Sequence, residues 1–186
     1  LSSSSAASDV YKRQLLEKAI FKRDSIAFYT AKSLNHSSEY KLFLENYPNS
    51  KFNIEAKNRF EERLFIEATL INTEKNYQRF LVEHSNSPYY SQIEDSIFAK
   101  HTSSNKISSY NSFIKTYPNN KNVNKAWKLI YKLYIADYSP ERIVEFQIDY
   151  PNYPFLEDLE SDLKLATKTL YPCLLYTSDA ADEEDS

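Results

Sequence analysis

The 186-residue sequence contains no glycine and no methionine. Without glycine the chain cannot form a P-loop or a dinucleotide-binding fingerprint, because both need backbone that approaches phosphate closely. One cysteine, Cys173, excludes an internal disulfide and a thiolate metal site. No apolar run reaches the roughly eighteen residues of a membrane-spanning helix. The missing methionine leads us to expect a fragment of a longer chain.

Both ends of the sequence resemble a translated sequencing adapter. The stretch SSAASDVYKRQ (4–14) matches a transposon-type library adapter, and the reverse complement of that DNA, read one base out of phase, gives CLLYTSDAADE (173–183). We therefore assign 1–14 and 173–186 to adapter and expect them to be disordered. Lys12, Arg13 and six acidic residues lie in these segments, so the net charge of −3 becomes about +1 for 15–172. That balance favours neither nucleic acid nor an anionic membrane surface.

The remaining sequence is rich in aromatic residues and repeats itself. YKLFLENYPNSK (40–51) returns as YNSFIKTYPNNK (110–121). The phenylalanine of this pattern falls at four positions with intervals of 37, 33 and 33 residues: Phe43, Phe80, Phe113 and Phe146. Further columns keep the same register, namely Tyr40, Tyr77, Tyr110 and Ile143 three residues before it, and Phe28, Phe65, Phe98 and Tyr131 fifteen before it. Such a period indicates stacked repeats.

Each repeat is predicted to hold two helices. The first, for example 38–47, places apolar residues at i, i+3, i+4 and i+7 and stops at Tyr-Pro. Thr73 and Ser139 stand at its N-cap, and Pro140 takes the first helical position. The second helix is expected to begin at the column Ser50, Ser87, Asn120 and Tyr153, and to be one turn longer near 60–70, where the 37-residue unit has four extra residues.

The predicted fold class is all-α, a right-handed α-solenoid of helix-turn-helix repeats of about 33–37 residues. It occupies 15–172, with about four units and a partial first one. Residues 15–34 are interpreted as the second helix of an earlier unit, which leaves the array open at its amino end.

The motif F-[LI]-x2-Y-P-x-[SN]-x5-A, carried by Phe43–Ala56 and Phe113–Ala126, resembles the tetratricopeptide repeat. It is similar to repeats of bacterial outer-membrane assembly lipoproteins, and closer to the helical N-terminal region of bacterial WG-repeat proteins. The resemblance covers 15–172 and implies a non-catalytic protein–protein interaction or scaffolding module from a larger bacterial protein. The alternative is a helical spacer of a cell-envelope lipoprotein or enzyme whose functional domain lies outside these residues.

No arrangement of residues typical of catalysis is present. The three histidines, His36, His84 and His101, do not stand at metal-ligand spacing, and no Gly-x-Ser-x-Gly elbow exists. Paired carboxylates such as Glu61–Glu62 are typical of a solvated helix face, and the basic stretch 119–125 falls where a loop is required. The sequence predicts no enzyme activity, cofactor, metal, nucleic-acid binding or membrane insertion, and an unidentified protein partner.

The partner is expected on positions between the packing columns: Lys41, Glu45, Gln78, Asn111, Lys115 and Glu145. Trp127 is a further contact candidate, because the equivalent slots hold Asp24, Glu61 and Glu94, residue types that are usually exposed.

Overall fold

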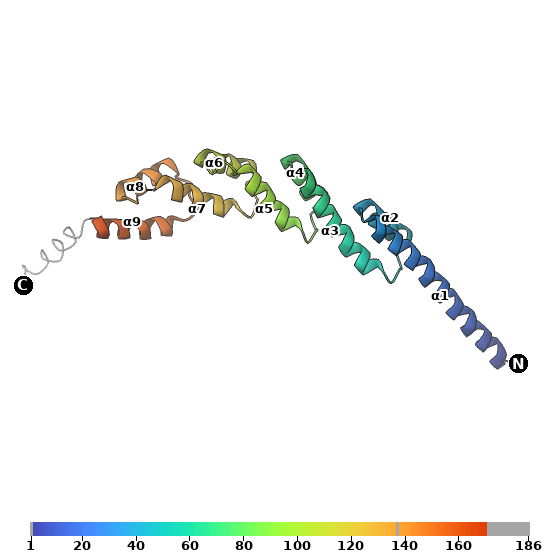
Figure 1. The fold of residues 1–186 in the computed structure, drawn as a ribbon. Coiled ribbons are helices and arrows are strands. Elements are labelled where there is room, and N and C mark those ends of the chain that lie inside the picture. The colour runs from blue at the N-terminus through green and yellow to red at the C-terminus, as the bar shows by residue number, and fades with distance from the viewer. Residues whose placement is uncertain (1, 137, 171–186) are drawn as a thin grey trace, which may run out of the picture. The chain divides into compact units, whose positions relative to one another are not determined.

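The computed structural model describes residues 2–136 and 138–170, and this part of the chain is all-α, with nine helices and no strand (Figure 1). The helices are α1 (Ser2–Leu34), α2 (Ser37–Asn46), α3 (Asn53–Ile71), α4 (Glu74–Glu83), α5 (Tyr90–His101), α6 (Ile107–Thr116), α7 (Val123–Tyr134), α8 (Pro140–Asp149) and α9 (Leu156–Leu170). The chain divides into two compact units between Ile93 and Glu94. The predicted all-α class is confirmed.

Four of the helices, α2, α4, α6 and α8, are ten residues long and begin at intervals of 37, 33 and 33 residues. We call them the first helices. They end where the sequence predicts, because the residue before Pro or Ser leaves the α region, as at Tyr47 (φ −129°, ψ 57°) and Tyr117 (φ −127°, ψ 58°). The hydroxyls of Thr73 and Ser139 accept hydrogen bonds from the backbone N–H of Asn76 and Arg142, so both predicted N-caps are confirmed.

The second helices, α3, α5, α7 and α9, start three residues later than expected. Ser50, Ser87 and Asn120 do not cap a helix; their side chains accept hydrogen bonds from the backbone N–H two residues on, at 3.3, 3.3 and 2.9 Å. Each closes a short turn before the helix begins. The same residue types favour caps and turns through the same local hydrogen bond, so the prediction confused the two. The extra turn is in the predicted place, since α3 has 19 residues and α5 and α7 have 12.

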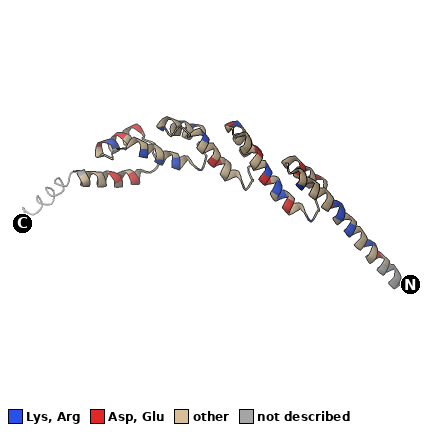
Figure 2. Cartoon of the chain, in the orientation of Figure 1, with Lys and Arg blue, Asp and Glu red and all other residues tan. Residues whose placement is uncertain are grey.

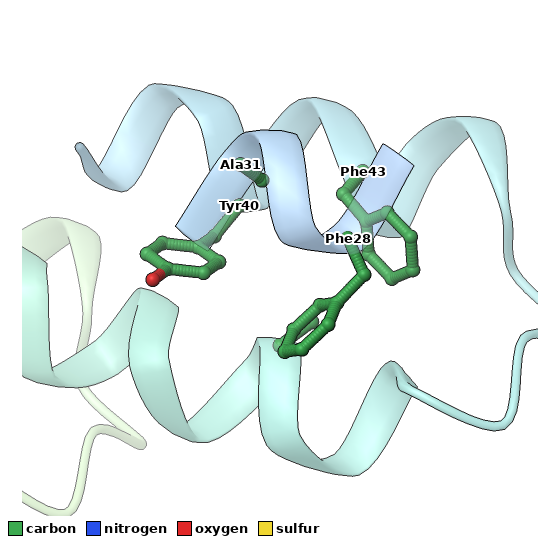
Figure 3. Packing of buried hydrophobic residues seen from close by; sticks show 5 residues of the cluster. Phe28, Ala31, Tyr40 and Phe43 are labelled. Atoms are coloured by element: carbon green, nitrogen blue, oxygen red, sulfur yellow. The ribbon is translucent and has the colours of Figure 1, made fainter. Parts of the chain in front are cut away.

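The core follows the aromatic columns. All four anchor phenylalanines and all four residues three positions before them are buried. In the first unit Phe28, Tyr40, Phe43 and Ala56 form one cluster, with the Phe28 and Phe43 rings edge to face at 5.6 Å (Figure 3). In the second unit Phe98–Phe113 and Tyr131–Phe146 repeat this contact at 5.1 and 4.9 Å. Such pairs add about 0.5–1.5 kcal/mol to the burial of their area.

Asparagine does the work of glycine at the ends of the second helices. Asn35, Asn72 and Asn105 have left-handed backbones, with φ of 55°, 47° and 51°, a conformation that asparagine tolerates better than other residues with a Cβ. Each side-chain oxygen accepts a hydrogen bond from the tyrosine hydroxyl five residues on, at 3.3, 3.0 and 2.7 Å. In the fourth repeat both partners change together, to Tyr138 (φ 50°) and Ile143.

Residues 2–14, which the sequence analysis expected to be disordered, lie in α1. They contain no proline or glycine and include alanine, lysine, arginine and glutamine, which favour helix, so they continue the helix that begins the repeat array. Their side chains from Ser8 onward are exposed. The second adapter-like segment, 173–186, lies outside the described residues.

Candidate interaction surface

A row of exposed positions runs along the first helices on the side away from the core. These positions lie two residues before and two residues after each anchor phenylalanine, and we call them the outward row. In the first unit they are Lys41, Glu45, Gln78 and Val82, and in the second unit Asn111, Lys115, Val144 and Ile148. All are exposed except Asn111, which is half-buried. The 100° turn per residue places them opposite the anchor.

The chemistry of the outward row differs from helix to helix. On α2, Lys41 and Glu45 form an i,i+4 ion pair at 4.0 Å. On α4 the row includes Val82, which is 82% exposed. In the second unit, α6 carries polar Asn111 and Lys115, and α8 carries two exposed aliphatic residues, of which Ile148 is 72% exposed. A polar start and an aliphatic end are therefore present in each unit.

The structure brings five of the sequence-predicted site residues into this row: Lys41, Glu45, Gln78, Asn111 and Lys115. Asn111 is partly engaged, because its amide donates a hydrogen bond to the Tyr150 hydroxyl at 3.2 Å. Glu145 is exposed but lies one position out of register, and it pairs with Arg142 at 2.8 Å. The sequence analysis missed Val82, Val144 and Ile148, although their spacing from the anchor phenylalanine was a readable signal.

Trp127 is partly buried and packs within the second unit. Its ring meets those of Tyr150 and Tyr153 edge to face, each at 6.1 Å. The slots taken as equivalent were expected to be exposed, and this was wrong for two of them: Asp24 is 3% exposed and Glu94 is 9% exposed. The second helix of one repeat meets the following turn here, which removes water from the side chain.

In this slot the acidic residues are held by polar partners from the chain. The Arg23 guanidinium pairs with Asp24 at 2.7 Å. Ser87 donates to Glu61 at 2.7 Å, and the backbone N–H of Lys121 donates to Glu94 at 3.1 Å. A buried carboxylate needs such donors, so these groups stabilise contacts between successive repeats. Trp127 and Tyr153 replace the acid and its polar partner by an aromatic pair.

Two equivalent grooves lie between second and first helices of the first unit. The groove between α1 and α2 has a volume of about 210 Å³, and the groove between α3 and α4 about 240 Å³. Their lining residues correspond one to one at an interval of 37, for example Ala27 with Leu64 and Leu42 with Arg79. None of the sequence-predicted site residues lines either groove.

Ionisable groups with shifted pKa values lie mostly around Asp162 in the second unit. The Tyr131 hydroxyl donates to Asp162 at 2.9 Å, and burial together with this bond raises the pKa of Tyr131 well above its usual range. A hydrogen bond to the same carboxylate raises the pKa of Tyr138 to about 12. Burial raises the pKa of Tyr153 to about 12. These tyrosines stay protonated at neutral pH and act as donors.

Within residues 2–136 and 138–170 no three histidine, cysteine, aspartate or glutamate side chains gather as metal ligands. His36 lies 4.0 Å from Glu67, His84 packs against the Phe80 ring, and the Nε2 atom of His101 lies 3.1 Å from the Ser112 hydroxyl. The histidines thus lie apart, at contacts of different repeats. No helix in the described part is long and apolar enough to cross a bilayer.

Basic and acidic side chains are interspersed, and Figure 2 shows both signs along α3. A surface of this kind offers no stripe of one sign for a polyanion. Comparison of the chain with protein-family models, curated proteins and solved structures gave no match.

Proposed function

We propose that the chain is a non-catalytic protein-binding module, a helical solenoid of tetratricopeptide-like repeats, and that its partner contacts the outward row. The observation that carries this proposal is the exposure of aliphatic residues at repeat-equivalent positions, with Val82 and Ile148 more than two-thirds exposed. Exposed aliphatic side chains in register with a repeat mark a contact surface better than scattered ones do. The recurring ten-residue helices support the solenoid, since each can bury its apolar face only against neighbours.

The buried acids support a role without catalysis. Asp24, Glu61 and Glu94 are each held by a donor from the chain, so they serve contacts between helices. The resemblance to the helical region of bacterial WG-repeat proteins adds a scaffold that positions other domains. In that setting the outward row provides the binding surface and the aromatic columns provide rigidity.

The proposal is tested by selecting peptides from a random display library on the immobilised chain and measuring their affinity for variants. We expect Val82→Glu and Ile148→Glu to weaken selected peptides at least tenfold. Ile54→Glu is the matched control, because Ile54 is 79% exposed on α3, outside the row. Circular dichroism should show the same helix content for all three variants, since an exposed substitution changes stability by only about 0.5 kcal/mol.

Selected peptides that bind all three variants equally would refute the outward row as the site. A library that yields no peptide above background would refute the interaction module itself and favour the spacer role.

A further inference from the structure

The side of α1 that faces away from α2 carries an uncovered stripe. Its residues are spaced by three and four, so they lie on one helix face: Leu16, Ala19, Arg23, Ile26 and Thr30. All five are exposed, and Ile26 is 62% exposed. The C-terminal part of this face borders a shallow hollow of about 510 Å³ that Tyr29 and Leu34 also line. The opposite side, with Phe28 and Ala31, is covered by α2.

The same stripe is covered on the next second helix. Counting 37 residues forward, Ala19 corresponds to Ala56, Arg23 to Phe60 and Thr30 to Glu67. Ala56 is fully buried in the cluster with Tyr40 and Phe43 of α2, and Phe60 packs against that cluster. Glu67 accepts hydrogen bonds from the Ser37 backbone N–H at 2.9 Å and from the Ser37 hydroxyl at 2.5 Å. On α3, therefore, this stripe is the seat of the preceding first helix.

Repetition of this interface fixes the chemistry of what α1 accepts. We propose that the stripe on α1 docks an amphipathic helix of about three turns from a partner protein, with aromatic residues at i, i+3 and i+7 as in α2. The partner helix would place its first aromatic residues over Ala19 and Ile26, as Tyr40 and Phe43 lie against Ala56 on α3. The site is separate from the outward row, and it stands whether or not that row binds a partner.

A second copy of the chain is a poorer source of this helix. In the described part each first helix already buries its anchor phenylalanine and the residue three before it. Donating one of them to a neighbouring molecule would expose that core, and burial of one large apolar side chain is a major stabilising contribution. A partner whose helix is not part of such a core loses nothing comparable.

The probe is a fluorescently labelled synthetic peptide with the α2 sequence, HSSEYKLFLENYPN (36–49), titrated with the full chain and followed by anisotropy. We expect saturable binding, lost when Tyr40 and Phe43 of the peptide are both serine. Ile26→Glu in the chain should weaken binding at least tenfold, and Val82→Glu, on the outward row, should leave it unchanged. Because Ile26 is exposed, its substitution leaves the fold intact, which circular dichroism checks.

A gain of affinity tests the register. Thr30 occupies the place of Glu67, and its hydroxyl donates to the Ile26 carbonyl at 2.8 Å. Thr30→Glu supplies the carboxylate that holds Ser37 on α3, so it should tighten peptide binding severalfold. A peptide with Ser37 and Ser38 replaced by alanine should lose this gain.

Three results would overturn the proposal. Binding that Ile26→Glu does not change would mean that the peptide exchanges with the chain's own α2 instead of docking on α1. Sedimentation showing a dimer that Ile26→Glu converts to monomer would assign the stripe to a second copy. Absence of peptide binding by the folded chain would remove the site, while the display selection on the outward row would still report on the proposed function separately.

Discussion

The asparagine–tyrosine bond at the end of α3 is expected to couple backbone conformation to core packing. Tyr77→Phe removes the hydroxyl that donates to Asn72 at 3.0 Å and should lower the free energy of unfolding by about 1 kcal/mol. Asn72→Ala loses the same bond and also places a Cβ residue without a local partner in the left-handed region, which costs about 1 kcal/mol more. We therefore expect about 2 kcal/mol for Asn72→Ala.

Asn72→Gly separates the two contributions. Glycine adopts the positive φ freely, so this variant should lose the hydrogen bond without the backbone penalty and should be more stable than Asn72→Ala. In the double variant Asn72→Gly/Tyr77→Phe the hydrogen bond is lost only once, so the coupling energy should be about 1 kcal/mol. Urea unfolding followed by circular dichroism at 222 nm provides all four values.

The three copies of this contact give an internal scale. The bond lengths are 2.7 Å for Tyr110–Asn105, 3.0 Å for Tyr77–Asn72 and 3.3 Å for Tyr40–Asn35. Coupling should fall in that order, since a longer bond is weaker. Additive effects in all three pairs, or an Asn72→Ala variant as stable as Asn72→Gly, would refute the reasoning.

Three further predictions concern the core and the ionisable groups. Phe113→Ala, at a fully buried site, should cost about 3–5 kcal/mol, whereas Lys115→Ala should change stability by less than about 0.5 kcal/mol, as thermal unfolding will show. The raised pKa of Tyr138, about 12 against an ordinary 10.0, means that its stabilising contribution is complete below pH 10 and is lost as pH rises toward 12; Asp162→Asn should move its titration, read by absorbance at 295 nm, back toward 10.0. Burial would raise the pKa of Asp95, but hydrogen bonds from Lys121 and Asn122 outweigh it and lower that pKa, so the contribution of this carboxylate is lost only as pH falls below its ordinary 3.8; Lys121→Met should raise the Asp95 pKa, measured by carboxyl NMR titration.

The positions of the first helices could be predicted because three independent signals coincide in every repeat. The anchor phenylalanine fixes the buried face, Tyr-Pro fixes the end in three of the four units, and Thr73 or Ser139 fixes the start. Such agreement between local signals is what makes a sequence specify one structure. The starts of the second helices could not be predicted from Ser50 and its equivalents, because one serine side chain can close a turn or cap a helix.

The asparagine–tyrosine bond was within reach of the sequence. Asn-x4-Tyr occurs at 35–40, 72–77 and 105–110, always just before a first helix. The candidate surface was predictable only in part: Lys41 and Lys115 could be placed by their spacing, but Val82 and Ile148 have residue types that usually indicate the core. Their exposure depends on which neighbours reach them, and that is decided by packing between helices.

The additional turn in α3 bears on how such a chain tolerates changes in length. Four residues advance an α-helix by about 400°, so the far half of α3 is rotated by only about 40° relative to a twelve-residue helix. Its aromatic and small residues still meet α2 and α4. An insertion of two residues would turn that half by about 200° and present its polar side to the same neighbours. Natural variants of this chain should therefore gain or lose residues here in steps of three or four.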